Sequence, residues 1–204
     1  MSNKSNIIFI TSDQQRADCY GFAGRNIQTP HLDKLANTGT RFDSCITPNL
    51  VCQPSRASIL TGQLPFTHGV CDNGIDLKPE VAEQGFAEQL NKVGYKTSFI
   101  GKAHFATSST FQPTGTPECK HSSKKFGSEW YGPYMGFKHV ELMTLGHWYK
   151  EKGPTLPPEG QHFERFVFEE AGGPEIFDIW HKAAKPGYGA AQTWHSSLPV
   201  ALHS

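Results

Sequence analysis

Apolar and polar positions along the chain alternate between patterns typical of buried strands and of amphipathic helices. Residues 6–13 form a β-branched and aromatic run that ends in polar residues, which predicts a central strand buried on both faces. Residues 29–39 carry helix signals, with Thr29 as cap, Pro30 at the first position and Gly39 at the end. We expect the apolar face of this helix to pack on the sheet.

Further along, the pattern predicts a second alternation of helix and strand. Residues 40–46 predict a short strand, residues 63–74 are rich in turn formers, and residues 83–93 predict a helix that ends at Gly94. Residues 95–100 then predict a strand. A helix that leads into a strand in this way is typical of βαβ units, so we expect an α/β fold with a mainly parallel sheet flanked by helices.

Beyond residue 106 the periodic signal weakens. Residues 108–125 are polar and interrupted by proline and glycine, which is typical of a loop that sets specificity or is simply mobile. Residues 127–137 gather aromatic side chains, for which we expect core packing, and residues 146–153 predict a short helix.

The composition limits the classes of partner that we expect the chain to bind. The 204 residues can bury one substantial core, and the 19 basic and 19 acidic residues cancel, so no basic field predicts a nucleic-acid partner. The apolar run near the N-terminus is too short for a signal peptide or a membrane span, so we expect a cytoplasmic protein without a membrane partner. Five cysteines at irregular spacing favour reduced thiols over a disulfide framework.

Cys52 lies just ahead of a short apolar run that begins with Pro54 and ends at Gly62. Proline suits the first turn of a helix and glycine the position after its end, so we expect Cys52 at a helix start, where the helix dipole favours anions and lowers a thiol pKa. Arg56, one turn on, can reach the same place. Only three residues separate Cys52 from Arg56, which excludes a phosphatase-type Cys-x5-Arg loop. A buried structural cysteine remains the alternative.

Polar residues also follow the two longer predicted strands. Asp13 ends the first, and Lys102 and His104 follow the second. Ligands of open α/β sheets bind beyond the carboxyl ends of the strands. Alternation along an extended chain would point Lys102 and His104 in one direction. A helix cap at Asp13 and a surface lysine are the structural alternatives.

Three segments of the chain together resemble landmarks of the sulfatase family. They are Cys-Gln-Pro-Ser-Arg at residues 52–56, Thr-Pro-His-Leu-Asp-Lys-Leu-Ala at residues 29–36, and Gly-Lys-Ala-His at residues 101–104. The resemblance implies a truncated alkaline-phosphatase-like α/β fold, with residues 1–204 as the N-terminal portion of a catalytic domain. On this interpretation residues 1–105 are the core that carries the motifs, and residues 106–204 are rich in loops.

The resemblance also implies a reaction. In sulfatases the cysteine at the place of Cys52 is oxidised by a formylglycine-generating enzyme, and one hydroxyl of the formylglycine hydrate attacks sulfur or phosphorus before the other expels the product. It assigns catalytic roles to Cys52, Arg56 and His104, and contact with the substrate's oxyanion to Lys102. Asp13 would bind a divalent cation, for which calcium is expected first, with manganese or magnesium as alternatives.

Gln14 stands where many family members have a second aspartate after Asp13, which resembles the phosphonate monoester hydrolase and choline-sulfatase branches. An asparagine lines the anion pocket in those branches, and Asn73 is the candidate here, with a simple turn former as the alternative. The resemblance suggests His203, ahead of His195, as a substrate-facing histidine. The metal ligands expected on this interpretation are Asp13, Gln14 and Cys52.

Three functions follow as expectations. The first is a sulfuric ester hydrolase acting on a small-molecule sulfate ester, and the second is a phosphonate monoester or phosphodiester hydrolase, since both substrates carry one negative charge at the reacting centre. The third is a non-catalytic remnant, because family members draw further metal ligands from a later strand that this sequence lacks. We therefore expect the chain by itself to bind divalent metal poorly, to turn over little, and to associate, with a homo-oligomer left open.

Overall fold

The computed structural model describes residues 4–13, 15–108, 110, 112–119, 121–143 and 162–169. The chain forms two compact units, Met1–Ile46 and Thr47–Ser204. The helix predicted over residues 146–153 lies outside the described residues. Within the described part of the chain, no helix has the length and apolar character needed to cross a bilayer.

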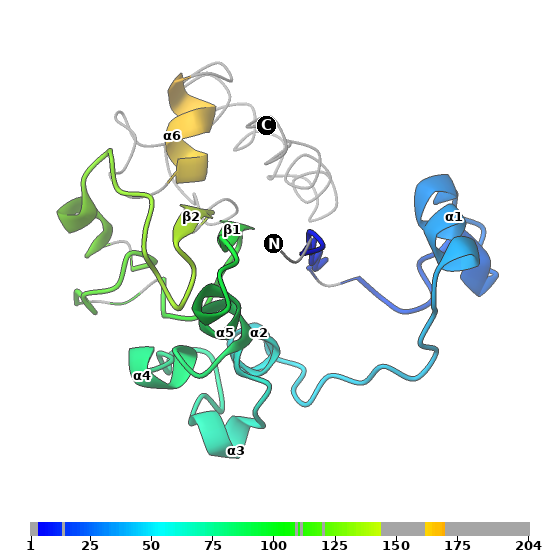
Figure 1. The fold of residues 1–204 in the computed structure, drawn as a ribbon, viewed down its shortest axis with the longest axis horizontal. Helices are drawn as coiled ribbons and strands as arrows, with labels where there is room; N and C mark the ends of the chain where they lie inside the picture. The colour runs from blue at the N-terminus through cyan, green and yellow to red at the C-terminus, as the bar shows by residue number, and fades with distance from the viewer. Residues whose placement is uncertain are drawn as a thin grey trace, which may run out of the picture. The chain divides into compact units, whose positions relative to one another are not determined.

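The first unit contains the 3-10 turn η1 (Gly21–Ala23) and the helix α1 (Pro30–Thr38), drawn in blue in Figure 1. Pro30 opens α1 and Gly39 follows its end, as predicted. The Thr29 hydroxyl does not cap the helix: it accepts from the Gly21 N–H (2.8 Å) and donates to the Asp33 carboxylate (2.8 Å). Thr29 and Asp33 therefore tie η1 to the start of α1.

The strands predicted in the first unit are not formed, and those predictions are wrong. Residues 6–12 and 40–46 have no regular secondary structure, and Ile8 and Ile10 are 84% and 86% exposed. The apolar face of α1 is not buried either, since Leu35 is 65% exposed. A strand needs a neighbour to pair its backbone groups, and the sheet of the described residues consists of two other strands.

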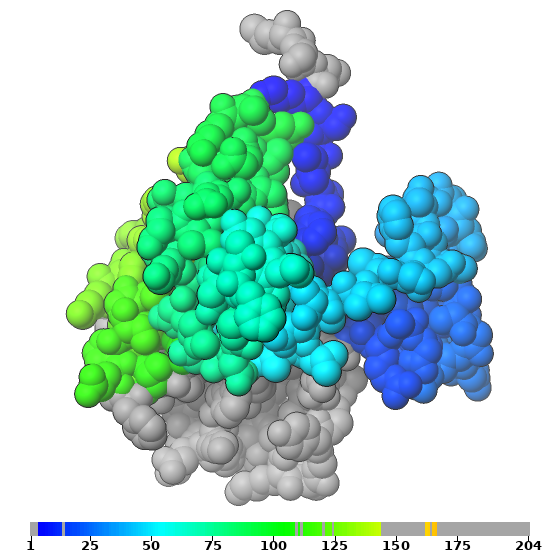
Figure 2. Space-filling model, turned by 90° about the horizontal axis from the view of Figure 1, so that it is seen from below, coloured from blue at the N-terminus to red at the C-terminus, as the bar shows by residue number. Residues whose placement is uncertain are grey.

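The second unit holds most of the regular structure. Its helices are α2 (Cys52–Thr61), α3 (Pro65–His68), α4 (Pro79–Ala82), α5 (Phe86–Lys92), the 3-10 turn η2 (Ser123–Phe126) and α6 (His162–Glu169). Of these, α2 begins at Cys52, and Gly62 (φ 69°) follows its last residue, Thr61, as predicted. A helical turn, α3, falls in the region expected to be a loop. In the space-filling view the cyan and green segments that contain α2 to α5 form one continuous surface (Figure 2).

The helix predicted over residues 83–93 is shorter in the structure because Gly85 precedes it in an extended conformation. A Cβ atom at Gly85 would lie 2.5 Å from the Leu60 carbonyl oxygen, so only glycine allows α5 to start this close to α2. The neighbouring α3 is joined to α2 by His68, whose Nδ1 accepts from the Val70 N–H (3.1 Å) while Nε2 donates to the Ser58 hydroxyl (2.9 Å).

The sheet of the second unit consists of β1 (Ser98–Gly101) and β2 (His139–Leu142), which run parallel with Phe99 opposite Val140 (Figure 1). The parallel pairing confirms the predicted α/β class, although β2 itself was not predicted. On β2 packs α6 through His162, whose Nδ1 accepts from the Leu142 N–H (3.0 Å) and whose Nε2 donates to the Trp130 carbonyl (2.8 Å). Burial lowers the pKa of His162 to about 4.

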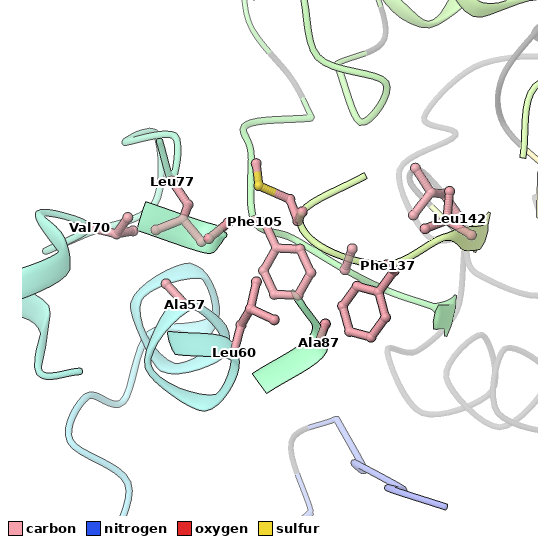
Figure 3. Close-up of a cluster of buried hydrophobic side chains, with 12 residues drawn as sticks. Ala57, Leu60, Val70, Leu77, Ala87, Phe105, Phe137 and Leu142 are labelled. Carbon is pink, nitrogen blue, oxygen red and sulfur yellow. The ribbon is translucent and has the colours of Figure 1, made fainter. Parts of the chain in front are cut away.

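The core of this unit joins α2, α5, both strands and the segment after β1. Phe105 lies in the middle of it, with Leu60 of α2 on one side and Phe137 on the other (Figure 3). The ring of Phe99 meets those of Phe105 and Phe137, with centroids 5.7 and 5.3 Å apart. Phe137 and Tyr134 belong to the aromatic segment at 127–137, so its predicted role in core packing is confirmed.

Candidate active site

The N-terminus of α2 carries Cys52 as its first residue, half-buried. Val51 precedes it in an extended conformation, and no side chain of the N-cap residue bonds the helix. Instead, the Gln53 N–H donates to Oδ1 of Asn73 (3.0 Å), which reaches the helix from a loop 20 residues further on. The carboxamide oxygen of Asn73 thus caps α2, and its Nδ2 group is the remaining donor.

Gln53 was a site residue that sequence reasoning missed. Its side chain is completely buried, Nε2 donates to the Ile75 carbonyl (2.7 Å) and the Phe105 carbonyl (3.4 Å), and Oε1 accepts from the Gly74 N–H (2.9 Å). One carboxamide therefore joins the start of α2, the Asn73 loop and the segment after β1. No sequence signal marks such a residue, because its partners are far away along the chain.

The sequence predicted Arg56 and Lys102 in one site, and in the structure a hydrogen bond joins them. Arg56 Nη1 donates to the backbone carbonyl of Lys102, and both residues are half-buried. The contact uses the Lys102 backbone and one of the five guanidinium N–H groups. It brings the residue after β1 to the second turn of α2.

His104 also lies in the segment after β1, but its backbone does not continue the strand as the sequence predicted. We expected Lys102 and His104 to point alike along an extended strand, whereas β1 ends at Gly101 and His104 has a left-handed backbone (φ 51°). Both side chains are half-buried. The strand alternation therefore does not apply beyond Gly101.

Glu118 is a second site residue that sequence reasoning missed. The carboxyl group is buried beneath the segment after β1, and its Oε1 accepts from the N–H groups of Phe105 (3.0 Å) and Ala106 (3.1 Å) and from the Tyr134 hydroxyl (2.9 Å). Burial raises the pKa of Glu118 to about 7, although the hydrogen bonds from Tyr134 and the backbone lower it. The polar segment at 108–125 gave no sign that it would contribute a buried carboxyl group.

The other predicted residues lie elsewhere. Asp13 is in the first unit, in a bend after the exposed apolar run, while Gln14, His195 and His203 lie outside the described residues. Among the residues that the structure describes, no group of three or more His, Cys, Asp and Glu side chains gathers in a way that could hold a metal ion. The structure thus places the Cys52, Arg56, Asn73, Lys102 and His104 segments in one unit, and Asp13 belongs to the other unit.

Comparison with known proteins identifies the family. The family model described as Sulfatase matches residues 5–170. The chain belongs to the sulfatase family. The chain is 42% identical over 106 residues to an N-acetylglucosamine-6-O-sulfatase of Bacteroides thetaiotaomicron, a match that covers 50% of the chain and 18% of the relative. It is 32% identical over 105 residues to a choline-sulfatase of Rhizobium meliloti, covering 51% of the chain and 20% of that protein.

The fold comparison agrees with this assignment. A crystal structure from Bacteroides fragilis, described as the sulfatase yidJ, matches this sulfatase with a TM-score of 0.50 and 28% identity, over 64% of this chain and 29% of that one. The predicted sulfatase-like α/β fold is confirmed. The chain spans about a fifth of the length of the curated relatives it matches.

Proposed function

We propose that this sulfatase hydrolyses small-molecule sulfate esters with a formylglycine formed from Cys52. The observation that carries the proposal is that Cys52 is the first residue of α2, in the unit where hydrogen bonds join that helix to Asn73 and to the Lys102 segment. Family membership supports the reaction class, and the resemblance described above supports the modification. Once formed by a formylglycine-generating enzyme, the hydrated aldehyde supplies the nucleophile.

The residues around Cys52 would bind and orient a sulfate ester. The N-terminal end of α2 favours an anion through its dipole, and the Nδ2 group of Asn73 is a further donor beside it. Arg56 and Lys102 would add positive charge, and the hydrogen bond from Arg56 Nη1 to the Lys102 backbone carbonyl orients the guanidinium group. Loss of one such donor to a developing oxyanion typically costs about 3 kcal/mol of transition-state stabilisation.

His104 would hold and transfer a proton beside the Cys52 position. Its left-handed backbone (φ 51°) sets where the imidazole begins. A histidine suits this role because its pKa lies near neutrality in ordinary surroundings. His203 stays a proposed contact for the substrate.

A divalent cation is part of the proposal through the family, with calcium first and manganese or magnesium as alternatives. Asp13, Gln14 and converted Cys52 would be oxygen ligands, and the cation would neutralise charge on the sulfate oxygens. Hard cations take six or more oxygen ligands, and the described residues gather no such set.

A second candidate is the hydrolysis of phosphonate monoesters or phosphodiesters. It is favoured by the position of Asn73 at the N-terminus of α2, where an amide donor could contact either anion. Sulfate esters and phosphodiesters both carry one negative charge at the reacting centre, so one pocket can accept both.

The deciding experiment compares kcat/KM on an aryl sulfate and on an aryl phosphonate monoester. The protein is expressed together with a formylglycine-generating enzyme, and rates are normalised to aldehyde content. We expect the aryl sulfate to give the higher kcat/KM. A higher value on the phosphonate would replace the first proposal by the second.

A further inference from the structure

The segment that follows β1 rests on a buried carboxyl group that the proposed reaction does not use. Glu118 is 3% exposed, and its carboxyl group accepts hydrogen bonds from the backbone amides of His104, Phe105 and Ala106. Successive N–H groups that converge in this way form a concave anion site. Here the group that accepts from these N–H groups is a carboxyl group of the protein itself.

The conformation of His104 shows why the carboxyl group matters. Its φ of 51° is left-handed, which is uncommon for a residue with a side chain, and such a conformation persists when the surroundings over-determine it. A left-handed residue beside right-handed or extended ones is what turns consecutive N–H groups toward one point. The bonds to Glu118 and the backbone of His104 therefore support each other.

Other hydrogen bonds hold Thr107 and the Phe105 carbonyl, next to the amides that donate to Glu118. The Asp76 carboxylate accepts from the Thr107 N–H (2.7 Å) and hydroxyl (2.6 Å), and the Phe105 carbonyl accepts from the Leu77 N–H (2.8 Å). The Phe105 ring is held in the core (Figure 3). The Tyr134 hydroxyl donates to Oε1 of Glu118 (2.9 Å) and so holds the carboxyl group under the loop.

We propose that Glu118 is a positioning residue for the candidate active site, which holds the segment from Lys102 to Ala106 in the shape that presents Lys102 and His104. The Glu118 carboxyl oxygen is the common acceptor for the three amides, and the Tyr134 hydroxyl holds it in place. The inference rests on the proposed function for its catalytic consequence. Its structural part stands on the hydrogen bonds alone.

The experiment compares Glu118→Ala and Glu118→Gln with wild type, with Glu83→Gln as the matched control because Glu83 is an exposed carboxylate. Amide hydrogen exchange is measured at residues 104–106, and kcat and KM on an aryl sulfate are measured per aldehyde-containing molecule. Tyr134→Phe is a milder variant that removes only the hydroxyl.

For Glu118→Ala we expect exchange at the three amides to accelerate at least about tenfold, and kcat to fall at least about tenfold while KM changes less. Glu118→Gln keeps an acceptor oxygen and should stay within about threefold of wild type in both readouts. Tyr134→Phe should accelerate exchange at the same amides, to a smaller degree. Glu83→Gln should change neither readout.

The two readouts separate the possible failures. Unchanged exchange at residues 104–106 in both Glu118→Ala and Tyr134→Phe would overturn the proposal. Faster exchange with wild-type kcat would overturn its catalytic part, because a purely structural role lowers stability without changing turnover of the folded enzyme. If wild type itself lacks aryl-sulfate turnover, the proposed function fails, and hydrogen exchange still decides whether Glu118 holds the segment.

Discussion

Two adjacent residues at the start of α2 have different tasks. Cys52 is half-buried, while Gln53 is completely buried and bonded to the Asn73 loop and to the Phe105 segment. A buried carboxamide whose partners are all main-chain groups is costly to replace, because each lost partner leaves a polar group unpaired. The motif residue between the cysteine and the proline therefore maintains the geometry around the proposed nucleophile.

Cys52 carries the first prediction. In protein made together with a formylglycine-generating enzyme, the peptide that contains Cys52 should hold an aldehyde that reacts with hydrazides, since the motif and its helix start are both present. Mass spectrometry of that peptide is the measurement. Cys52→Ala should abolish the reaction and Cys19→Ala should not. A thiol that persists at Cys52 would contradict the assignment.

The titration of Glu118 leads to a prediction of how the protein's stability depends on pH. Its pKa is raised from a usual 4.5 to about 7, so between these values the folded protein keeps a proton that the unfolded chain has lost. Its contribution to stability therefore falls as pH rises from 4.5 to 7, by up to about 3 kcal/mol. Glu118→Gln removes this titration, so we expect its stability relative to wild type to be greater at pH 8 than at pH 5.

Urea denaturation at the two pH values is the measurement. Because Tyr134 donates to the carboxyl group and has a pKa raised well above its usual value by burial, it stays protonated throughout this range. An equal difference between Glu118→Gln and wild type at both pH values would show that Glu118 does not titrate in this window.

At the scale of elements, α2 is capped by a residue from another loop. Asn73 bonds the Gln53 N–H in place of a local cap, so the start of the helix and the position of the loop depend on each other. A hydrogen bond from Arg56 also joins α2 to the backbone carbonyl of Lys102. Helix capping and the proposed anion site thus share one residue.

Substitution of Asn73 separates these two roles. Asn73→Ala should cost about 1 kcal/mol of stability through loss of the cap. Asn73→Asp keeps the acceptor oxygen and places a negative charge at the helix start, so stability should be preserved while KM for an aryl sulfate rises by about tenfold or more through charge repulsion. Denaturation midpoints and Michaelis kinetics are the measurements. Unchanged KM in Asn73→Asp would place the substrate away from this residue.

At the scale of the whole molecule, the residues that the sequence predicted for the site are divided between the two units. Asp13 follows the exposed apolar run of the first unit, whereas Cys52, Arg56 and Lys102 belong to the second. The proposal therefore predicts that metal binding responds to a change in the first unit.

Calorimetric titration with calcium tests this dependence. We expect Asp13→Ala to lower the affinity for calcium by about tenfold or more, because hard cations need carboxylate oxygens. Asp18→Asn is the matched control, since Asp18 forms exposed ion pairs with Arg16 and Arg25 in the same unit. Equal calcium affinity in wild type and Asp13→Ala would exclude Asp13 as a ligand. Manganese and magnesium titrations compare the alternative ions.

Local signals in the sequence determined several helix boundaries. Pro30 begins α1 and Gly39 follows its end, and Gly62 follows the end of α2, because proline and glycine act on the backbone within a turn of their own position. The family landmarks were also legible, since they are short runs of specific residues, and the family model confirms the family they indicate.

Only the tertiary structure decided which segments meet. The run at 6–13 has the composition of a strand but forms none in the structure, while β2 gave no clear signal and pairs with β1. Gln53, Asn73 and Glu118 bond partners 12 to 52 residues away. The free energy of pairing a strand or burying a carboxyl group depends on such distant partners, and no local pattern records which they are.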